Sequence, residues 1–236
     1  MNMILLTGAD LTGDNMACLT EDRRVTHIQT VLKAGTGDVL HVGLLGGKRG
    51  RGTVVEQSAG RIVLSISLFD DPPAPLPLIL VIGMCRPKSF RKALHYAVAM
   101  GVKQIHVIKT WRVDKSYWSS PVLEETNLRS EMVLALEQSQ DTIMPSIRIH
   151  TLFKPFVQDI FPELSAKRLR LLAHPYNAQR CPADIQTDAV LVVGPEGGFI
   201  QYEVDTFLAL GCIPVTTGRR ILRVENAVPA LLGRMF

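Results

Sequence analysis

Three segments in the last third of the sequence hold the residue types best suited to bind a ligand. The first, Gly194–Phe199, follows an apolar run and contains three glycines in five residues. Glycine lets the backbone approach a ligand closely and exposes N–H groups to it. The lysine and hydroxyl of the phosphate-binding GxxxxGK[ST] motif are absent, and so is the GxGxxG pattern. A tight turn between a strand and a helix would explain the same residues without a ligand.

The other two segments combine polar, aromatic and apolar side chains. His174–Asn177 reads His-Pro-Tyr-Asn, and Thr216–Arg223 contains one glycine and three arginines. Leu222 stands between two of these arginines and could line a pocket for a flat, partly apolar ligand. Arg219 and Arg220 could equally form a solvated surface pair.

Two clusters of cations could contact the phosphates of a nucleic acid, because the planar fork of arginine binds phosphate bidentately. One falls on a glycine-rich turn and the other at the start of an expected helix. Their members are Lys48, Arg49 and Arg51 in the first cluster, and Arg86, Lys88, Arg91 and Lys92 in the second. Each cluster alone could be a solvated turn or helix start. Two clusters in separate parts of the chain favour a nucleic acid.

The predicted secondary structure differs on the two sides of a proline-rich stretch. Four prolines fall in the six residues 72–77, which predicts a stiff, extended linker between domains at 1–71 and 72–236. The first domain carries 7 basic and 8 acidic residues, and the second carries 19 and 14. The whole excess of positive charge therefore lies in the second domain.

The first domain has the pattern of a small β-barrel with one helix. Residues 39–45 and 52–56 flank the first cation cluster, and residues 61–68 alternate like a half-buried strand. A helix is expected from Asp22 to Gly35. Its apolar face would consist of Val25, Ile28, Val31 and Leu32.

The second domain alternates apolar strands with helices, which indicates a parallel sheet covered on both faces. Strands are expected at 78–84, 104–109, 169–173 and 189–193, and helices at 87–100, 121–140, 202–210 and 224–235. Ligands bind such sheets beyond the carboxyl ends of the strands. The glycine loop and the His174–Asn177 segment follow expected strands, so they belong to this edge.

The composition excludes several classes of protein. Of 236 residues, 47% are hydrophobic and 20% are charged, as in a folded globular chain. The longest apolar run, 78–84, is too short to span a membrane, and the start lacks the basic and apolar regions of a signal peptide. The four cysteines show no CxxC spacing. We therefore expect a soluble cytoplasmic protein with reduced thiols, without a metal site or a membrane partner.

Two segments together carry a family resemblance. Val192–Phe199, followed by Gly218–Ala227, resembles the paired motifs of the SPOUT-class methyltransferases that modify uridine N3 in small-subunit ribosomal RNA. The resemblance covers the whole chain. Arg24–Lys33 is similar to part of the family's PUA-like barrel, and Leu136–Ser139 to part of its long helix.

The resemblance implies a fold, a cofactor and partners. The fold would be α/β: a small PUA-like RNA-binding β-barrel, then a SPOUT domain with a carboxy-terminal trefoil knot, one of the rare exceptions to unknotted chains. A homodimer would bind S-adenosylmethionine and methylate 16S rRNA, alone or in the small ribosomal subunit. The implied cofactor-binding residues are His174, Pro175, Gly194, Pro195, Glu196, Gly197, Gly198, Thr217, Gly218, Ile221, Leu222 and Arg223.

The resemblance also extends the list of expected RNA contacts. They become Arg24, His27, Lys48, Arg49, Arg51, Arg86, Lys88 and Arg91. For His27 the alternative is a place on the polar face of an amphipathic helix.

Two residues are the catalytic candidates under this resemblance. Arg223 could stabilise negative charge that develops on the uracil carbonyl oxygens. Glu225 could accept the N3 proton, could orient Arg223, or could simply stabilise the start of a helix through its dipole.

The chain departs from the family in helices expected to face RNA or a second subunit. Gln140 and Asp141 replace a glycine and an arginine that usually follow the Glu-Gln-Ser of the long helix, and the helix before Gly101 lacks the usual Gln-Lys pair. The exact uridine is therefore open. A SPOUT methyltransferase for another RNA and a non-catalytic RNA-binding or ribosome-assembly protein are the alternatives.

Overall fold

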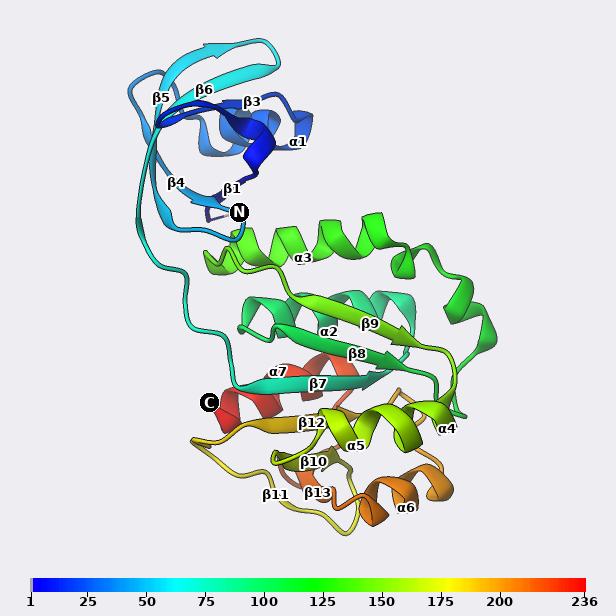
Figure 1. Ribbon diagram of the computed structural model, residues 1–236. Helices are drawn as coiled ribbons and strands as arrows, with labels where there is room; N and C mark the ends of the chain where they lie inside the picture. The colour runs from blue at the N-terminus through cyan, green and yellow to red at the C-terminus, as the bar shows by residue number, and fades with distance from the viewer. Residues whose placement is uncertain (1) are drawn as a thin grey trace. The chain divides into compact units, whose positions relative to one another are not determined.

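The computed structural model describes residues 2–236 as two compact units, each with its own β-sheet (Figure 1). The described residues of the first unit are 2–74 and 133–144, and the second unit consists of 75–132 and 145–236. The long helix α3 (Glu125–Ser139) contributes residues to both units. The α/β class predicted from the sequence is confirmed.

The first unit is a six-stranded, curled sheet in the order β1-β4-β5-β6-β3-β2 (Figure 1). All of its pairings are antiparallel except β1 with β4. Gly50 is required where β5 bends over β6, because a Cβ there would lie 1.9 Å from the Ser67 carbonyl oxygen. The elements of this unit are β1 (Ile4–Leu6), η1 (Gly8–Asp10), β2 (Leu11–Gly13), β3 (Met16–Leu19), α1 (Asp22–Thr26), η2 (His27–Leu32), β4 (Val39–Leu44), β5 (Arg49–Ser58) and β6 (Arg61–Asp70).

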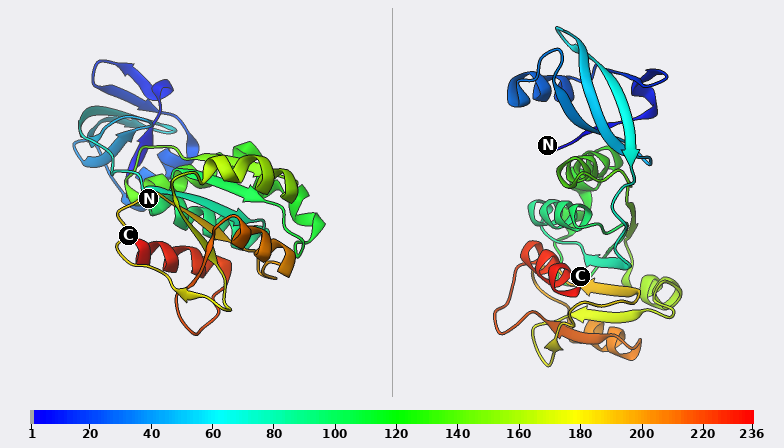
Figure 2. Two further views of the ribbon diagram at one scale, coloured as in Figure 1. Left: turned by 60° about the horizontal axis from the view of Figure 1, so that its bottom comes forward. Right: turned by 90° about the vertical axis from the view of Figure 1, so that its left-hand side faces the viewer.

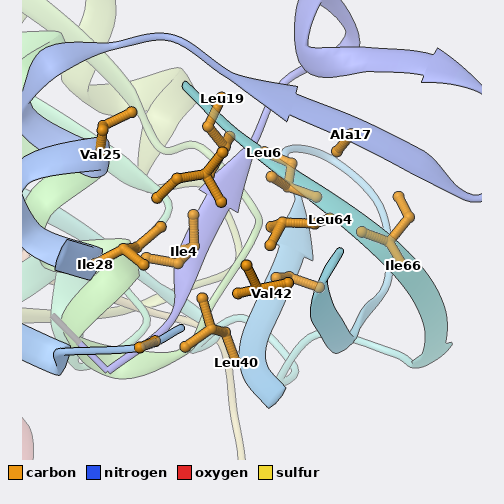
Figure 3. Close-up of a cluster of buried hydrophobic side chains, with 13 residues drawn as sticks. Ile4, Leu6, Ala17, Leu19, Val25, Ile28, Leu40, Val42, Leu64 and Ile66 are labelled. Carbon is orange, nitrogen blue, oxygen red and sulfur yellow. The ribbon is translucent and has the colours of Figure 1, made fainter. Parts of the chain in front are cut away.

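The hollow of the curled sheet is filled by one apolar cluster (Figure 3). Alternate residues of the strands point into it, as the predicted pattern in β6 requires: Ile62, Leu64 and Ile66 are all buried. Helix α1 and the start of η2 close the cluster with Val25 and Ile28.

The second half of the predicted helix differs from expectation. Its residues form a π-helical turn, η2, and the left-handed Lys33 (φ 52°) ends it two residues before the predicted Gly35. A π turn holds more residues than an α turn, so the side chains that follow rotate away from the apolar face. Val31 and Leu32 are 64% and 42% exposed, and their predicted place in the core is wrong.

The two residues at the end of α3 that differ from the family pattern, Gln140 and Asp141, have structural roles in the first unit. Gln140 adopts a left-handed conformation (φ 55°) just after the helix ends. Asp141 is 3% exposed, and its carboxylate accepts a hydrogen bond of 2.9 Å from the Ile143 N–H. The expectation that Asp141 faces RNA is therefore wrong.

The second unit is a seven-stranded sheet in the order β11-β13-β10-β12-β7-β8-β9, and every pairing is parallel. The strands are β7 (Leu78–Gly83), β8 (Gln104–Ile108), β9 (Ser146–His150), β10 (Leu169–Ala173), β11 (Gln179–Arg180), β12 (Ala189–Val193) and β13 (Ile213–Thr216). All residues of β7 and β12 are buried, because helices cover both faces (Figure 2).

Helices α2 and α7 lie side by side on one face, while η5, α5 and α6 pack on the other (Figure 2). Phe156, Phe161 and Phe207 fill the interior of this second face. The helices of the unit are α2 (Pro87–Ala99), η3 (Lys115–Ser119), η4 (Pro121–Leu123), α4 (Phe153–Pro155), η5 (Phe156–Ile160), α5 (Phe161–Leu164), α6 (Gln201–Ala209) and α7 (Val224–Met235). Within residues 2–236, no helix has the length and apolar content to cross a membrane. The trefoil knot stays a prediction.

Candidate functional site

A cavity of about 640 Å³ opens at the carboxyl edge of the second unit's sheet. The loops after β8, β10, β12 and β13 and the first residues of α6 and α7 line it. All residues expected to hold the cofactor contribute to this lining: His174, Pro175, Gly194, Pro195, Glu196, Gly197, Gly198, Thr217, Gly218, Ile221, Leu222 and Arg223. A smaller hollow of about 280 Å³ lies at the opposite edge and contains none of these loops.

The glycine loop after β12 is shaped by close contacts. A Cβ on Gly197 would lie 2.9 Å from the Cβ of Arg112, so no larger residue fits without a shift. Gly198 has a φ of 68°, a conformation that other residues adopt only with strain. Its N–H donates to the Pro195 carbonyl at 2.8 Å and closes the turn. These glycines are therefore explained by a loop that keeps its backbone against the cavity.

The glycine loop is tied to the start of α2 by Glu196. Its carboxylate accepts a 2.8 Å hydrogen bond from the N–H of Arg86, which precedes the first residue of α2. A carboxylate at this place also interacts favourably with the positive end of the helix dipole. Glu196 thus has a structural role in addition to lining the cavity.

The loop after β8 supplies a cavity residue that the sequence reasoning missed. Arg112 lines the cavity, and its guanidinium donates to the Gly197 carbonyl at 3.0 Å. The preceding N–H, of Trp111, donates to Glu203 Oε1 at 2.7 Å, and the other oxygen of Glu203 accepts from Ile200 N at 3.0 Å. Glu203 is 2% exposed. The rule that ligands bind at the carboxyl ends of strands points to this loop as well.

The third loop brings exposed side chains to the mouth of the cavity. Ile221 is 70% exposed and Leu222 38%, and Arg223 is also exposed. The carbonyl of Arg223 accepts hydrogen bonds from Asn226 N at 2.9 Å and Ala227 N at 2.7 Å, which begin α7. The backbone of Arg223 is therefore fixed while its guanidinium stays accessible.

Glu225 lies in the first turn of α7 and does not line the cavity. It is 9% exposed, and its Oε2 is buried without a hydrogen-bond partner. Burial raises the pKa of the Cys85 thiol, and the negative charges of Glu196 and Glu225 raise it further. No ion pair joins Glu225 to Arg223 within residues 2–236, so nothing supports the orienting role.

His174 stands at the end of β10 with its N–H bonded to the Val215 carbonyl at 3.0 Å. Burial lowers the pKa of its imidazole. Its ring meets that of Tyr176 edge to face at 5.9 Å. The cavity therefore has a neutral aromatic side chain where β10 ends.

Arg24, expected to contact RNA, is a structural residue of the first unit. It is 7% exposed, and two of its nitrogens bind Asp10 at 2.8 and 2.9 Å. A third contact runs to Glu21. Burial favours a raised pKa for Asp10, but hydrogen bonds from Arg24 and Thr7 outweigh it and lower the pKa. The prediction that Arg24 binds RNA is wrong, because its guanidinium is buried within the first unit and paired with Asp10 and Glu21.

The remaining expected RNA contacts of the first unit differ in accessibility. Lys48 is exposed on the β4–β5 turn, 3.8 Å from Asp71, and Arg51 is exposed in strand β5, so the turn does not contain all three cations of the predicted cluster. Arg49 is half-buried and donates to the carbonyls of Asp71 at 3.2 Å and Gln140 at 3.0 Å. His27 is half-buried at the start of η2.

The cation cluster of the second unit lies at the start of α2. Arg86 and Lys88 are exposed there, and Arg91 forms an ion pair with Glu131 at 3.0 Å. Since Glu196 binds the Arg86 N–H, this cluster starts next to the glycine loop. Within the described part of the chain, no group of three or more His, Cys, Asp or Glu side chains could hold a metal ion.

A family description matches residues 72–235 of the chain, and that family is the RNA methyltransferase domain. Among curated proteins, the ribosomal RNA small subunit methyltransferase E of Treponema pallidum is 26% identical, over 98% of this chain and 88% of its own. The corresponding enzyme E 1 of Borreliella burgdorferi is 24% identical, over 98% and 95%.

Two solved structures share the fold over nearly the whole chain. The protein Lpg2936 of Legionella pneumophila, solved with the bound cofactor SAM, has a TM-score of 0.77 at 22% identity and covers 98% of this chain and 95% of its own. The ribosomal RNA small subunit methyltransferase E of Neisseria gonorrhoeae, bound to S-adenosyl methionine, has a TM-score of 0.76 at 20% identity, with the same coverage.

Proposed function

The chain belongs to the RNA methyltransferase domain family, and from this premise we propose that it transfers a methyl group from S-adenosylmethionine to uridine N3 of 16S ribosomal RNA. One observation carries the proposal: the two segments that resemble this family's signature, together with the His174 loop, surround a single cavity at the carboxyl edge of a parallel sheet. The curated relatives over nearly the full length are small-subunit rRNA methyltransferases, which supports the choice of RNA.

The residues around the cavity fit S-adenosylmethionine. A volume of about 640 Å³ falls in the range of small-molecule sites, roughly 300–1,000 Å³. Val193, Phe199 and Val215 give it apolar walls suited to a flat base, and the glycine loop allows close approach of a ligand to the backbone. The cofactor, when bound, supplies a methyl group on a positively charged sulfonium.

The chain's own task is then to hold the uracil ring and manage one proton. Uridine N3 is a poor nucleophile while it carries its proton. Loss of this proton leaves negative charge that is shared with the neighbouring carbonyl oxygens. Arg223, with a fixed backbone and an accessible guanidinium at the cavity, is our candidate to stabilise this charge. Positioning of the ring against the methyl group would contribute roughly 7–11 kcal/mol to lowering the barrier.

We propose Glu225 as the candidate for the proton acceptor, because its buried Oε2 has no hydrogen-bond partner and it lies two residues from Arg223. Its side chain does not line the cavity, so this role requires that the carboxylate move toward the bound uridine. The competing role is stabilisation of the start of α7 by a carboxylate near the helix dipole. Glu225→Gln separates the two: an acceptor role predicts a lower kcat with little change in the free energy of unfolding, whereas the helix-dipole role predicts a loss of stability with kcat kept.

We further propose that the enzyme acts in the cytoplasm as a homodimer, with residues 1–71 as an RNA-binding domain and 72–236 as the knotted catalytic domain. The exposed cations Lys48 and Arg51 support the RNA-binding role of the first part, and Arg86 and Lys88 that of the second. Light scattering of the full chain tests the dimer.

Two measurements test the central proposal. Isothermal titration of the purified chain with S-adenosylmethionine should show one site per chain. Nucleoside mass spectrometry of 16S rRNA from a deletion strain should lack a 3-methyluridine that the wild-type gene restores and Arg223→Ala does not. Arg61→Ala, which removes an exposed ion pair with Glu56 and a hydrogen bond to the Cys18 sulfur, both in the first unit, is the control and should restore it.

The outcomes separate the parts of the proposal. If the protein binds S-adenosylmethionine but the nucleoside profile of 16S rRNA is unchanged in the deletion strain, the 16S rRNA target is refuted. The protein could then still methylate another RNA. Absence of cofactor binding would refute the methyl-transfer chemistry itself.

A further inference from the structure

We propose that the indole of Trp111 stacks on an unpaired base of the RNA substrate at the mouth of the cavity. The inference rests on the proposed function, because it assigns a substrate contact to that site. Trp111 is the most exposed of the large hydrophobic side chains of residues 2–236, at 79%. Water contact over most of an indole is unfavourable, so an aromatic ring presented in this way needs an explanation.

The segment that carries Trp111 is firmly attached on both sides. Thr110, before it, is 4% exposed at the end of β8. The N–H of Trp111 itself donates to the buried carboxylate of Glu203 at 2.7 Å. Arg112, after it, donates to the Gly197 carbonyl at 3.0 Å. The Trp111 N–H is thus held directly, and the side chains of its two neighbours are buried or bound, so ordering this segment costs little further entropy when the indole binds a ligand.

This attachment also places the indole beside the reacting site. Arg112 lines the cavity and touches the glycine loop, whereas Trp111 does not line the cavity. Trp111 is thus the sequence neighbour of a lining residue, and in this proposal its exposed indole lies at the rim of the cavity. A base next to the target uridine in the RNA chain would reach the rim when the uridine enters the cavity.

The neighbouring surface has the chemistry of a single-stranded RNA contact. Tyr202, adjacent to Glu203, is 51% exposed and adds a second aromatic ring. Lys109, Arg112 and Lys154 are exposed cations on the loops after β8 and β9. Aromatic platforms flanked by cations bind unpaired nucleotides by stacking on the bases and attracting the phosphates. Charge complementarity thus favours RNA over an apolar protein segment as the occupant.

Intrinsic fluorescence tests the contact directly, because the chain contains only two tryptophans. In Trp118→Phe, Trp111 is the sole emitter; the buried Nε1 of Trp118 has no hydrogen-bond partner, so this change removes none. Titration of this full-length variant with an in vitro 16S rRNA transcript should quench the emission. The reciprocal variant Trp111→Phe should show little quenching.

Kinetics test whether the contact matters to the reaction. Trp111→Ala should raise the KM for 16S rRNA on the order of 10-fold, since stacking of one base contributes about 1–3 kcal/mol. Its affinity for S-adenosylmethionine should stay within about twofold of wild type. Trp111→Phe should restore most of the RNA affinity, whereas Trp111→Leu should not, because leucine keeps apolar area without a π face. Tyr96→Ala, which removes a 42%-exposed aromatic from α2, is the matched control.

Several results would overturn the inference. They are RNA binding without a change in Trp111 emission, an unaltered KM in Trp111→Ala, or wild-type behaviour of Trp111→Leu. Emission that depends on protein concentration without RNA would instead mean that a second copy covers Trp111. If the wild-type protein does not bind S-adenosylmethionine and does not methylate RNA, the proposed function is refuted. The titration of Trp118→Phe then still decides whether RNA meets Trp111.

Discussion

Arg24 in the first unit and Arg223 in the second both stand at the start of a helix, yet their surroundings are opposite. Arg24 is buried, and its guanidinium is bound to Asp10 and Glu21. Arg223 is fixed only through its carbonyl, and its guanidinium is exposed at the cavity. The first unit uses this arginine to hold its fold together, and the second keeps one accessible for a ligand.

The largest effect should come from breaking the buried pair. Arg24→Ala leaves Asp10 charged and almost inaccessible, at 7% exposure, so we expect a loss of about 3–5 kcal/mol in the free energy of unfolding. Urea denaturation of the full chain measures it. The double variant Asp10→Ala, Arg24→Ala should recover part of the loss, since no buried charge then stands alone. An unchanged unfolding midpoint in Arg24→Ala would contradict the structural role.

Arg223→Ala should do the reverse and affect catalysis more than stability. We expect kcat to fall roughly 10²–10³-fold, as when a donor to a developing negative charge is removed. The free energy of unfolding should change by less than about 0.5 kcal/mol, because the side chain is exposed. Arg223→Lys should recover only part of the activity, since lysine keeps the charge without the planar fork. Equal losses of stability in Arg223→Ala and Arg24→Ala would remove the contrast between the units.

The sequence identifies what is local and misses what depends on distant partners. The last helix, Val224–Met235, was predicted with its observed bounds, because apolar spacing sets it locally. The loops that line the cavity could be grouped from the sequence, because segments that follow the strands of a parallel sheet share one edge. Nothing in the neighbourhood of Arg24 reveals that Asp10 closes on it in the folded chain. The same holds for Arg23, which binds Glu137 across 114 residues.

Some elements escaped prediction because their patterns are weak. Strand β9 reads Ser-Ile-Arg-Ile-His at the sheet edge and is largely exposed, so it lacks the continuous apolar run of β7. The π turn in η2 shifts Val31 and Leu32 out of the core, and no spacing rule anticipates it. Arg112 could have been found, since its loop follows a strand that the sequence does predict.

A further contrast concerns two buried pairs: Arg24 with Asp10 in the first unit is an ion pair, whereas His106 with His150 in the second is a pair of imidazoles. His106 is 1% exposed; its Nδ1 lies 2.9 Å from His150 Nε2, and its Nε2 lies 3.1 Å from Gln104 Nε2. Burial, with smaller effects of His150 and Arg148, lowers the pKa of His106 from 6.5 to about 4.

Because this imidazole is neutral in the folded protein but becomes protonated in the unfolded chain, the free energy of unfolding decreases as the pH falls. Its contribution is complete above pH 6.5 and is lost as the pH falls from 6.5 to about 4, at a cost of roughly 2–3 kcal/mol. Urea midpoints of wild type and His106→Gln, measured between pH 7 and 4, should therefore converge toward the acid end. Parallel curves would show that His106 does not titrate in this window.

The smallest expected effect distinguishes two arginines at the start of strand β5, Arg49 and Arg51, within the first unit. Arg51 is exposed, whereas Arg49 is half-buried and donates to the carbonyls of Asp71 and Gln140. If Arg51 contacts phosphate, Arg51→Ala should weaken RNA binding and reduce the slope of log K against log[salt] by about 1, with stability unchanged. Arg49→Ala should instead lower the free energy of unfolding by about 1–3 kcal/mol, because two carbonyls lose a charged donor. Filter binding over a salt series and urea denaturation of both variants measure the two effects. Equal salt slopes for wild type and Arg51→Ala would mean that Arg51 does not contact RNA, and the role of the first unit's exposed cations would have to be sought elsewhere.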